Sequence, residues 1–340
     1  MDRVIIIAEA GVNHNGDIRL AKKLIDVAVD ARVDYVKFQS FKADKLASPN
    51  AKKAQYQERN IRDNDTSQYN MLKYLEIGHQ DHLDLMAYCK EKKIKFLSSA
   101  FDADGVEYLD KLGLDVFKIP SGEITNYPYL RAVAKTNKPI ILSTGMANMV
   151  DVENALEILE KYGSEKENIT VLHCNTEYPT PMTDVNLYAM NSLKTRFGVK
   201  VGYSDHTLGI EVSIAAVALG AKVIEKHFTL DNLLPGPDHQ ASLEPEDLKA
   251  MVLAIRNIED AIAGNGAKEP SNSEQKNIKI ARKSIHACKD IKSGNTITEL
   301  DIIPLRPGDG ISPMHWNEVV GKTLTKDVNK FDKLKWSDLS

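Results

Sequence analysis

Short apolar runs alternate with longer amphipathic stretches from the N-terminus to Ala263. The apolar runs are rich in β-branched residues and predict strands over Val4–Ala8, Asp34–Phe38, Lys95–Ser98, Val116–Ile119, Ile140–Ser143, Thr170–His173, Lys200–Tyr203 and Val223–His227. Apolar residues at helical spacing predict helices between and after them, among them Ile18–Ala31, His79–Lys92, Val150–Tyr162, Gly209–Leu219 and Glu244–Ala263. Strands that alternate with helices indicate a parallel sheet, because parallel neighbours need a long crossover.

Eight strand–helix repeats favour a closed (β/α)8 TIM barrel over an open, doubly wound sheet. The open sheet would carry a glycine-rich dinucleotide turn after its first strand. The residues at that place, Glu9–His14, read EAGVNH, and the sequence contains neither GxGxxG nor a P-loop. We therefore expect an α/β barrel over residues 1–263.

The pattern changes after Ala263. Gly264-Asn265-Gly266 and a run around Pro270 predict a linker over residues 264–278. Residues 279–340 carry short apolar pairs separated by turns, which predicts a small β-rich domain. Within the barrel, Phe41–Tyr74 is long and polar, and such a loop is more often functional or a cover than a simple connector.

Charge and cysteine content narrow the functional classes. The 44 basic and 48 acidic residues give a net charge of -4, which disfavours binding to nucleic acid or an anionic membrane. Cys89, Cys174 and Cys288 form no CxxC pair, and this usage favours a reducing compartment. The apolar run near the N-terminus is too short for a signal sequence or membrane span. We expect a cytoplasmic protein.

Polar residues close every predicted strand. They are Glu9, Lys37, Gln39, Ser99, Lys118, Ser121, Ser143, His173, Tyr178, Ser204, His206, Glu225 and His227. The carboxyl ends of barrel strands meet at one face, which is where such folds do chemistry. These side chains are therefore expected to share one mouth.

Lys37 and Lys118 each interrupt an apolar run. A single lysine in a strand is more often an edge residue, but two buried ammonium groups at equivalent strand ends need an anion between them. Serine hydroxyls at the neighbouring strand ends add neutral donors. Together they predict a cage for a phosphate or carboxylate.

His206 and His227 end neighbouring strands and are candidates for a shared metal site. Neutral imidazoles suit Mn, Fe, Co or Zn, and two protein ligands would leave positions for water and substrate. The equally weighted alternative is that one histidine caps a turn and the other fills the core. Glu225 has the parity of His227 and should face the barrel interior. Asp238 lies in a proline-stiffened loop that we expect to hold it over the rim.

The residues at these strand ends resemble the sialic acid synthase family. The matching blocks are EAGVNHNG (Glu9–Gly16), VKFQSF (Val36–Phe41), FKIPSGE (Phe117–Glu123), LSTGMA (Leu142–Ala147), LHCNTEYPTP (Leu172–Pro181), GYSDHT (Gly202–Thr207), EKHFTLD (Glu225–Asp231), GPDH (Gly236–His239) and RPGDGISP (Arg306–Pro313). The resemblance is colinear over nearly the whole chain. It implies condensation of phosphoenolpyruvate with an N-acylated sugar aldehyde, a C-terminal antifreeze-like (SAF) domain, and a domain-swapped homodimer.

The resemblance also implies roles for individual residues. Metal ligands for Mn²⁺, with Mg²⁺ or Co²⁺ as alternatives, would be His206 and His227. The phosphoenolpyruvate site would be Lys37, Ser99, Lys118, Ser121, Ser143, Thr176 and Ser204. Sugar contacts would be Gln39, Tyr178 and Asp238, with Arg306 reaching in from the other subunit. Proton transfer would fall to Glu9 or Glu225.

Two departures from the family pattern matter. Ser99-Ala100 stands where family members often have Thr-Pro, so the hydroxyl is kept and the stiffening is not. Thr176 occupies a position where some members have asparagine, with Asn175 beside it, and either could reach the substrate.

The sequence leaves several functions open. The first expectation is N-acetylneuraminate synthase acting on N-acetylmannosamine, with phosphate released by C–O cleavage. A legionaminic acid synthase acting on a 2,4-diacetamido-trideoxyhexose is the close alternative, because the core motifs serve both. A Schiff-base lyase using Lys37 or Lys118 would not need His206 and His227. An inert barrel carrying an ice- or sugar-binding tail would not need ionisable groups at so many strand ends.

Overall fold

The computed structural model describes residues 3–61 and 65–340. The chain divides into two compact units, Met1–Ala263 and Gly264–Ser340. The first unit holds eight strands hydrogen-bonded in sequence order into a closed barrel, in which β1 pairs with both β2 and β8. All of these pairings are parallel, and the predicted (β/α)8 barrel is confirmed.

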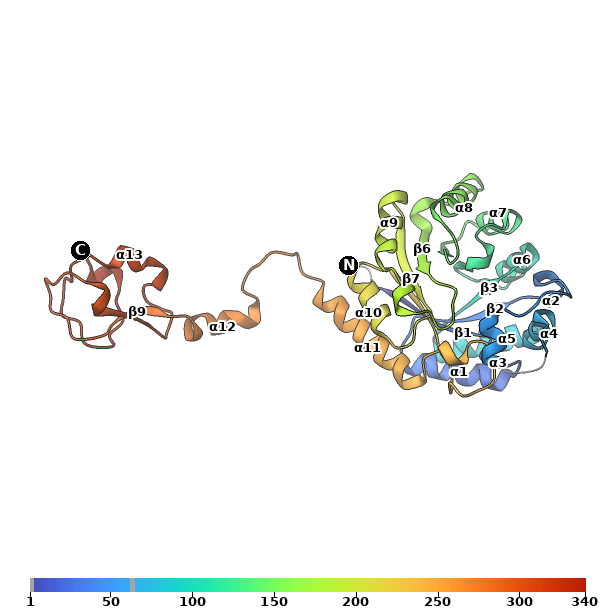
Figure 1. The fold of residues 1–340 in the computed structure, drawn as a ribbon, viewed down its shortest axis with the longest axis horizontal. Coiled ribbons are helices and arrows are strands. Elements are labelled where there is room, and N and C mark those ends of the chain that lie inside the picture. The colour runs from blue at the N-terminus through green and yellow to red at the C-terminus, as the bar shows by residue number, and fades with distance from the viewer. Residues whose placement is uncertain (1–2, 62–64) are drawn as a thin grey trace. The chain divides into compact units, whose positions relative to one another are not determined.

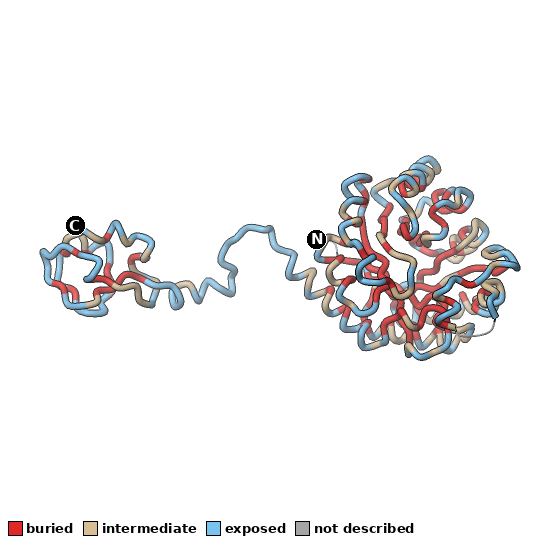
Figure 2. Tube along the Cα trace, viewed as in Figure 1, coloured by how far each residue is buried: buried red, intermediate tan, exposed pale blue. Residues whose placement is uncertain are grey.

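The barrel strands match the predicted apolar runs and several extend further toward their carboxyl ends. They are β1 (Ile5–Gly11), β2 (Tyr35–Ser40), β3 (Lys95–Ala100), β4 (Phe117–Ile119), β5 (Ile140–Ser143), β6 (Ile169–Cys174), β7 (Lys200–Asp205) and β8 (Val223–His227). Most residues of these strands are buried (Figure 2). Apolar residues on both faces are typical of parallel strands covered by helices.

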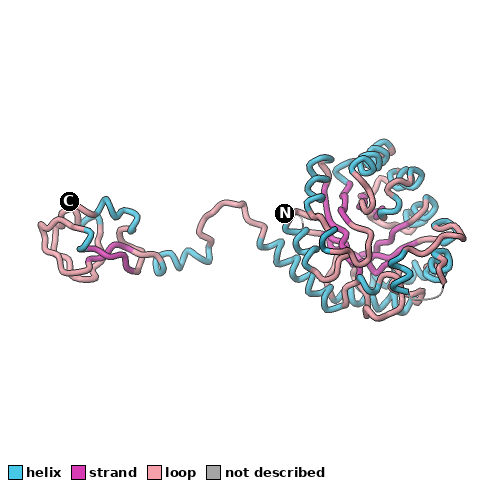
Figure 3. The backbone as a smooth tube through the Cα atoms, in the orientation of Figure 1, coloured by secondary structure: helices cyan, strands magenta, loops and turns pink. Residues whose placement is uncertain are grey.

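Helices surround the strands on the outside of the barrel (Figure 1, Figure 3). The longer ones are α1 (Ile18–Asp30), α5 (His79–Lys92), α6 (Ala103–Lys111), α7 (Tyr127–Ala134), α8 (Met149–Lys161), α9 (Tyr188–Phe197), α10 (Glu211–Ala218) and α11 (Pro245–Ala261). Side-chain caps start several of them, including Asp17 before α1 and Asn148 before α8. No helix in the described ranges is both long and apolar enough to span a membrane.

The strand register fixes which rim residues become neighbours. Glu9 of β1 pairs with Lys37 of β2 on one side and with His227 of β8 on the other. Ser204 of β7 pairs with Glu225 of β8. Because neighbouring Cα atoms in a sheet lie about 5 Å apart, these side chains meet at one end of the barrel.

The expected loop Phe41–Tyr74 is largely helical. It contains α2 (Ala43–Leu46), α3 (Gln55–Ile61) and α4 (Gln68–Leu75), while residues 62–64 lie outside the described part of the chain. Leu72 and Leu75 of α4 pack with Phe41 and Ala43 against Val12 of the barrel. This apolar cluster attaches the segment to the strand ends, so the segment covers part of the barrel face.

The second unit has its own small core. Its elements are α12 (Asn272–Ala281), β9 (Ser284–Ala287), β10 (Ile302–Leu305) and α13 (Trp316–Val319), with β9 and β10 antiparallel. Ile285, Ile297, Leu324 and Leu334 are almost fully buried within it. Helix α12 begins inside the stretch expected to be a linker.

Candidate active site

A cavity of about 690 Å³ lies among the carboxyl ends of the barrel strands. It is lined by every barrel residue assigned a role from the sequence except Asp238, namely Glu9, Lys37, Gln39, Ser99, Lys118, Ser121, Ser143, Thr176, Tyr178, Ser204, His206, Glu225 and His227. Residues far apart in the chain therefore meet in one place. Their convergence follows from the barrel, because parallel strands deliver their last residues to the same face.

Two ammonium groups and two carboxylates form a buried charge cluster in this cavity. Lys37 Nζ lies 2.8 Å from Glu9 Oε2 and 3.6 Å from Glu225 Oε2. Lys118 Nζ lies 3.5 Å from Glu225 Oε1. The anion expected between the two lysines is thus supplied, in the protein alone, by the carboxylate of Glu225. All four side chains are almost completely buried.

This cluster sets the pKa of its members in different directions. Burial raises the pKa of Glu9, and Lys37 only partly opposes it. Burial alone would also raise the pKa of Glu225, but Lys118 and Lys37 outweigh it and the pKa is lowered. Burial lowers the pKa of Lys118, whereas Glu225 and Glu9 overcome burial and raise the pKa of Lys37. Glu9 is therefore the carboxyl group of the cluster that holds a proton more readily.

Serine hydroxyls extend the cluster. Lys118 Nζ donates to Ser143 Oγ at 2.7 Å, and Lys37 Nζ donates to Ser99 Oγ at 3.3 Å. Ser204 Oγ donates to Glu225 Oε1 at 3.1 Å. Ser121 Oγ accepts from the backbone N–H of Gly145 at 2.9 Å. This set presents charged and neutral donors around one small space, which suits an anion with several oxygens.

The two histidines face each other beside the charge cluster. Their ring centroids are 5.4 Å apart. Burial lowers the pKa of His206 to about 4 and that of His227 well below its ordinary value, so both rings are neutral at pH 7. His206 Nδ1 is hydrogen-bonded to the carbonyl oxygen of Asn175, which leaves Nε2 as its free ring nitrogen.

These histidines fit a metal site with few protein ligands. His227 Nδ1 is buried and has no hydrogen-bond partner among the residues that the structure describes, which is costly for a polar atom. Across the described ranges, no group of three or more His, Cys, Asp or Glu side chains is arranged to hold a metal ion. A metal at this place would have His206 and His227 as its protein ligands and open positions for other groups.

Thr176, rather than the side chain of Asn175, faces the cavity. Asn175 Oδ1 accepts from the backbone N–H of Glu177 at 2.8 Å and so closes a local turn. Thr176 lines the cavity and approaches Gly145 closely. A Cβ atom placed on Gly145 would lie 2.5 Å from Thr176 Cγ2, so this close approach requires glycine.

Tyr56 lines the same cavity and was not predicted from the sequence. Its ring stacks on Tyr178 with centroids 4.9 Å apart, and Tyr178 in turn lies 4.1 Å from the ring of His206. Helix α3, which carries Tyr56, is held over the mouth by Arg59, which donates to the carbonyl of Tyr178 at 3.0 Å. The only sequence signal was an aromatic residue within an otherwise polar segment.

Asp238 lies in the loop after β8 and is buried beside His227, so its expected contact with the sugar stays a prediction. It is 7% exposed, and its Oδ2 lies 3.9 Å from His227 Nδ1. Ser242 Oγ donates to the Asp238 carbonyl at 2.7 Å and folds the loop inward. Burial raises the pKa of Asp238 to about 7, and Glu9 adds to the rise.

Arg306 belongs to the second unit. Its Nε donates to the carbonyl of Ala281 at 3.0 Å. It follows the short strand β10 and lies in the turn before Pro307. This contact lies within the second unit.

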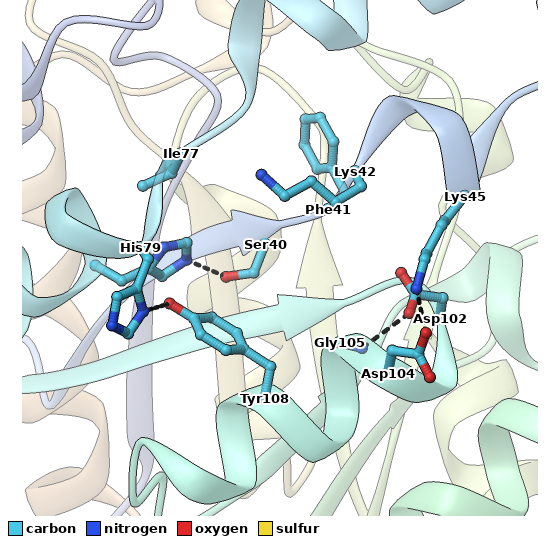
Figure 4. A pocket seen from close by; sticks show the side chains of 11 residues that line it. Ser40, Phe41, Lys42, Lys45, Ile77, His79, Asp102, Asp104, Gly105 and Tyr108 are labelled. Atoms are coloured by element: carbon cyan, nitrogen blue, oxygen red, sulfur yellow. Dashed lines mark hydrogen bonds and ion pairs between the residues drawn. The ribbon is translucent and has the colours of Figure 1, made fainter.

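A smaller cavity of about 240 Å³ lies between the start of the inserted segment, α5 and α6 (Figure 4). His79 Nδ1 and Tyr108 OH are 3.0 Å apart in its wall, and Lys45 pairs with Asp104 at its rim. None of the residues assigned a role from the sequence lines it. The candidate chemistry is thus confined to the larger cavity.

Comparison with known proteins agrees with the resemblance seen in the sequence. The model of the NeuB family matches residues 24–268, and that of the SAF domain matches residues 282–340. The N,N'-diacetyllegionaminic acid synthase of Campylobacter jejuni is 55% identical over 98% of this chain and 100% of its own length. The enzyme of the same name from Legionella pneumophila is 45% identical over 98% of this chain and 94% of its own.

A solved structure shows the same fold. The N-acetylneuraminic acid synthetase from Leptospira borgpetersenii is 37% identical, with a TM-score of 0.70, over 82% of this chain and 90% of that protein. The two family models together account for both units of the chain. The chain belongs to the NeuB family.

Proposed function

We propose that this protein condenses phosphoenolpyruvate with a 2,4-diacetamido-trideoxyhexose to give N,N'-diacetyllegionaminic acid and phosphate. The observation that carries the proposal is the meeting of two buried lysines and two neutral histidines in one cavity. The similarity to two legionaminic acid synthases, at 55% and 45% identity over nearly the whole chain, favours this sugar over N-acetylmannosamine. The function is that of a transferase.

The lysines and serines would bind phosphoenolpyruvate. Its phosphate and carboxylate groups need several donors. Lys37, Lys118 and the Ser204 hydroxyl already contact the carboxylate of Glu225. The hydroxyls of Ser99 and Ser143 are bonded to the two lysines. The substrate anion would take over interactions that Glu225 now makes. Ser121, Ser204 and Thr176 line the same part of the mouth and would complete the site.

The reaction forms one bond between the substrates and breaks one bond in phosphoenolpyruvate. The methylene carbon attacks the sugar aldehyde, which forms a C–C bond and leaves electron deficiency at the enol carbon. Water adds at that carbon, and phosphate then leaves with the bridging oxygen, so the C–O bond breaks. Fixing both substrates in one cavity removes much of the entropy cost of the encounter.

His206 and His227 would hold a divalent cation, with Mn²⁺ the first choice. Such an ion supplies Lewis acidity, which polarises an aldehyde oxygen in its open coordination sphere. The tautomer of His206 is set by its bond to the Asn175 carbonyl, which keeps Nε2 available. Glu9, which lines the cavity 2.8 Å from Lys37, would transfer protons to and from the sugar aldehyde.

The segment Phe41–Tyr74 would help to bind the sugar. Leu46, Leu72 and Phe101 bring apolar surface to the cavity, and the stacked pair Tyr56–Tyr178 adds an aromatic wall. A trideoxyhexose with two acetamido groups offers more methyl surface and fewer hydroxyls than N-acetylmannosamine. These apolar contacts therefore favour it, by the roughly tenfold to hundredfold expected of one or two methyl-sized contacts. Gln39 would add a polar contact.

We also propose that the protein acts as a homodimer in which Arg306 of one copy contacts the sugar bound by the other. Support comes from the sequence block Arg306–Pro313, which matches the family in order, and from the membership of the second unit in the SAF domain. The cytoplasm is the expected compartment for phosphoenolpyruvate-dependent chemistry.

A phosphate-release assay with phosphoenolpyruvate and Mn²⁺ tests this function. We expect turnover with the diacetamido-trideoxyhexose to exceed turnover with N-acetylmannosamine by at least tenfold in kcat/KM. Preference for N-acetylmannosamine would overturn the choice of sugar while leaving the reaction intact. Inactivation by borohydride in the presence of pyruvate, without any phosphate release, would instead support a Schiff-base lyase using Lys118.

A further inference from the structure

A second buried ion pair lies directly behind the two histidines. Lys226 Nζ is 3.0 Å from Asp205 Oδ2, and both side chains are completely buried. Asp205 is the last residue of β7 and directly precedes His206, and Lys226 precedes His227 in β8. Asp205 and Lys226 are register partners. Because side chains alternate along a strand, this pair points away from the cavity that the histidines face.

The pair fixes the residues that flank His206 in the chain. Asp205 Oδ1 accepts from the backbone N–H of Thr207 at 2.9 Å and from its hydroxyl at 2.7 Å. Lys226 Nζ donates to the carbonyl of Thr207 at 2.6 Å. Ser213 at the start of α10 donates to Asp205 Oδ2 at 2.7 Å. The residues before and after His206 are thus tied to each other, to β8 and to α10.

A buried ion pair by itself usually adds little to the free energy of unfolding. Removing two charges from water is expensive, and well-packed apolar residues often serve a fold equally well. Here the carboxylate and the ammonium group bond to each other, to Thr207 next to His206, and to Ser213 of α10. The arrangement fixes backbone direction at the place where the two strands end.

We infer that Asp205 and Lys226 are positioning residues that fix the separation and orientation of His206 and His227 for metal binding. This inference rests on the proposed function, in which those histidines are the ligands. Neither side chain is among the described residues that line the cavity. The pair acts through the backbone of the strand ends, and outer partners of this kind typically change metal affinity by about 10–100-fold.

The test compares Mn²⁺ affinity in the full-length protein and in variants, measured by electron paramagnetic resonance without substrates. The double variant Asp205→Leu/Lys226→Met removes both charges together, so no unpaired buried charge remains. We expect its Kd for Mn²⁺ to rise by about 10–100-fold. A Kd within twofold of the wild type would overturn the inference.

A milder variant keeps the test decisive if the double variant does not fold. Thr207→Val removes the hydroxyl that donates a hydrogen bond to Asp205. Lys226→Arg keeps the positive charge and serves as the conservative variant, with Lys226→Met as the variant that lacks the charge. We expect Thr207→Val to weaken Mn²⁺ binding several-fold and Lys226→Arg to bind more tightly than Lys226→Met. Kd values equal to that of the wild type in Thr207→Val, Lys226→Arg and Lys226→Met would overturn the inference.

A matched control uses the half-buried pair Asp34–Arg256, whose side chains are 3.0 Å apart where β2 begins. Asp34→Asn/Arg256→Gln should lower the thermal midpoint without changing the Mn²⁺ Kd. An equal rise in Kd there would contradict positioning by Asp205 and Lys226. If the wild-type protein showed no saturable Mn²⁺ binding, the metal part of the proposed function would fall and this inference with it. Unchanged Kd values in the variants would remove this inference alone.

Discussion

Replacing Glu225 with glutamine should lower the thermal stability of the ligand-free protein. It should also increase the stabilisation that phosphoenolpyruvate gives. Glu225 Oε2 lies 3.6 Å from Lys37 and Oε1 lies 3.5 Å from Lys118, and all three side chains are almost completely buried. Glutamine has the same shape and can still accept a hydrogen bond from Ser204. The change therefore removes one negative charge and little else.

The expected loss follows from the contacts that remain. Removing one partner of a buried ion pair costs about 3–5 kcal/mol. Lys37 keeps Glu9 at 2.8 Å, so we expect the lower end, about 3 kcal/mol. Lys118 keeps no other carboxylate within 4.0 Å among the described residues. For a domain of this size, about 3 kcal/mol lowers the thermal midpoint by roughly 6–12 °C.

Phosphoenolpyruvate should reverse this loss, because its anionic groups would replace the missing carboxylate between the lysines. The assay is thermal unfolding of the wild type and of Glu225→Gln, each with and without saturating phosphoenolpyruvate and without metal. We expect a larger ligand-induced rise in the variant. Glu153→Gln is the control, since Glu153 pairs with Arg196 at 2.8 Å on the surface and such pairs contribute about 0–1 kcal/mol.

The reasoning would be refuted by a variant that unfolds at the wild-type temperature and gains no more from phosphoenolpyruvate than the wild type. That outcome would mean that the two lysines do not share an anion. A variant that loses stability but gains nothing extra from the ligand would contradict the assignment of the site to phosphoenolpyruvate. The expected kcat of Glu225→Gln is also lower, which steady-state phosphate release measures.

Three further predictions concern the sugar side, the second unit and pH. Tyr56→Ala should raise the sugar KM by roughly two- to tenfold, the equivalent of about 0.5–1.5 kcal/mol for a stacked aromatic pair, and change the phosphoenolpyruvate KM by less than twofold. Tyr56→Phe should behave like the wild type, because among the described residues the hydroxyl is hydrogen-bonded only to Gln57, at 3.4 Å. Equal sugar KM values in the wild type, Tyr56→Ala and Tyr56→Phe would disprove the sugar contact. Arg306→Ala should raise the sugar KM much more than the phosphoenolpyruvate KM, and equal effects on both would count against its role. His14 is buried and its pKa is lowered to about 4 by burial, so the neutral ring is the folded form. Stability from His14 is present above pH 6.5 and is lost as pH falls toward 4, by about 2.5 kcal/mol at pH 4.5. Urea unfolding between pH 7 and 4.5 should therefore show a shallower pH dependence in His14→Gln, and identical dependences would contradict this.

Most of the barrel and its mouth could be predicted because both follow from strand periodicity. A short apolar run between amphipathic stretches defines each strand, and the closed parallel barrel then brings every strand end to one face. Parity alone placed Glu225 inside with His227, and the structure agrees. The sequence could not show that Glu225 lies between the two lysines, since that depends on side-chain lengths across three strands.

Other features lacked a local signal. The helices α2 to α4 are short and depend on packing against Val12 and Phe41, so they show little periodicity of their own. Tyr56 could not be placed without them. The prolines around Asp238 indicated a stiff loop near the rim, but they could not show that its carboxylate is buried beside His227. Asp205 and Lys226 were overlooked because their parity points them away from the cavity.

The central claim is that this cavity joins the carbon skeletons of its substrates and releases phosphate from the enol carbon. The most direct test is turnover of phosphoenolpyruvate labelled with ¹⁸O at the bridging oxygen, with the diacetamido-trideoxyhexose and Mn²⁺ present. We predict that mass spectrometry finds the label in the released phosphate and a nine-carbon 2-keto acid beside it. Unlabelled phosphate, or a product formed with no phosphate release, would contradict the account.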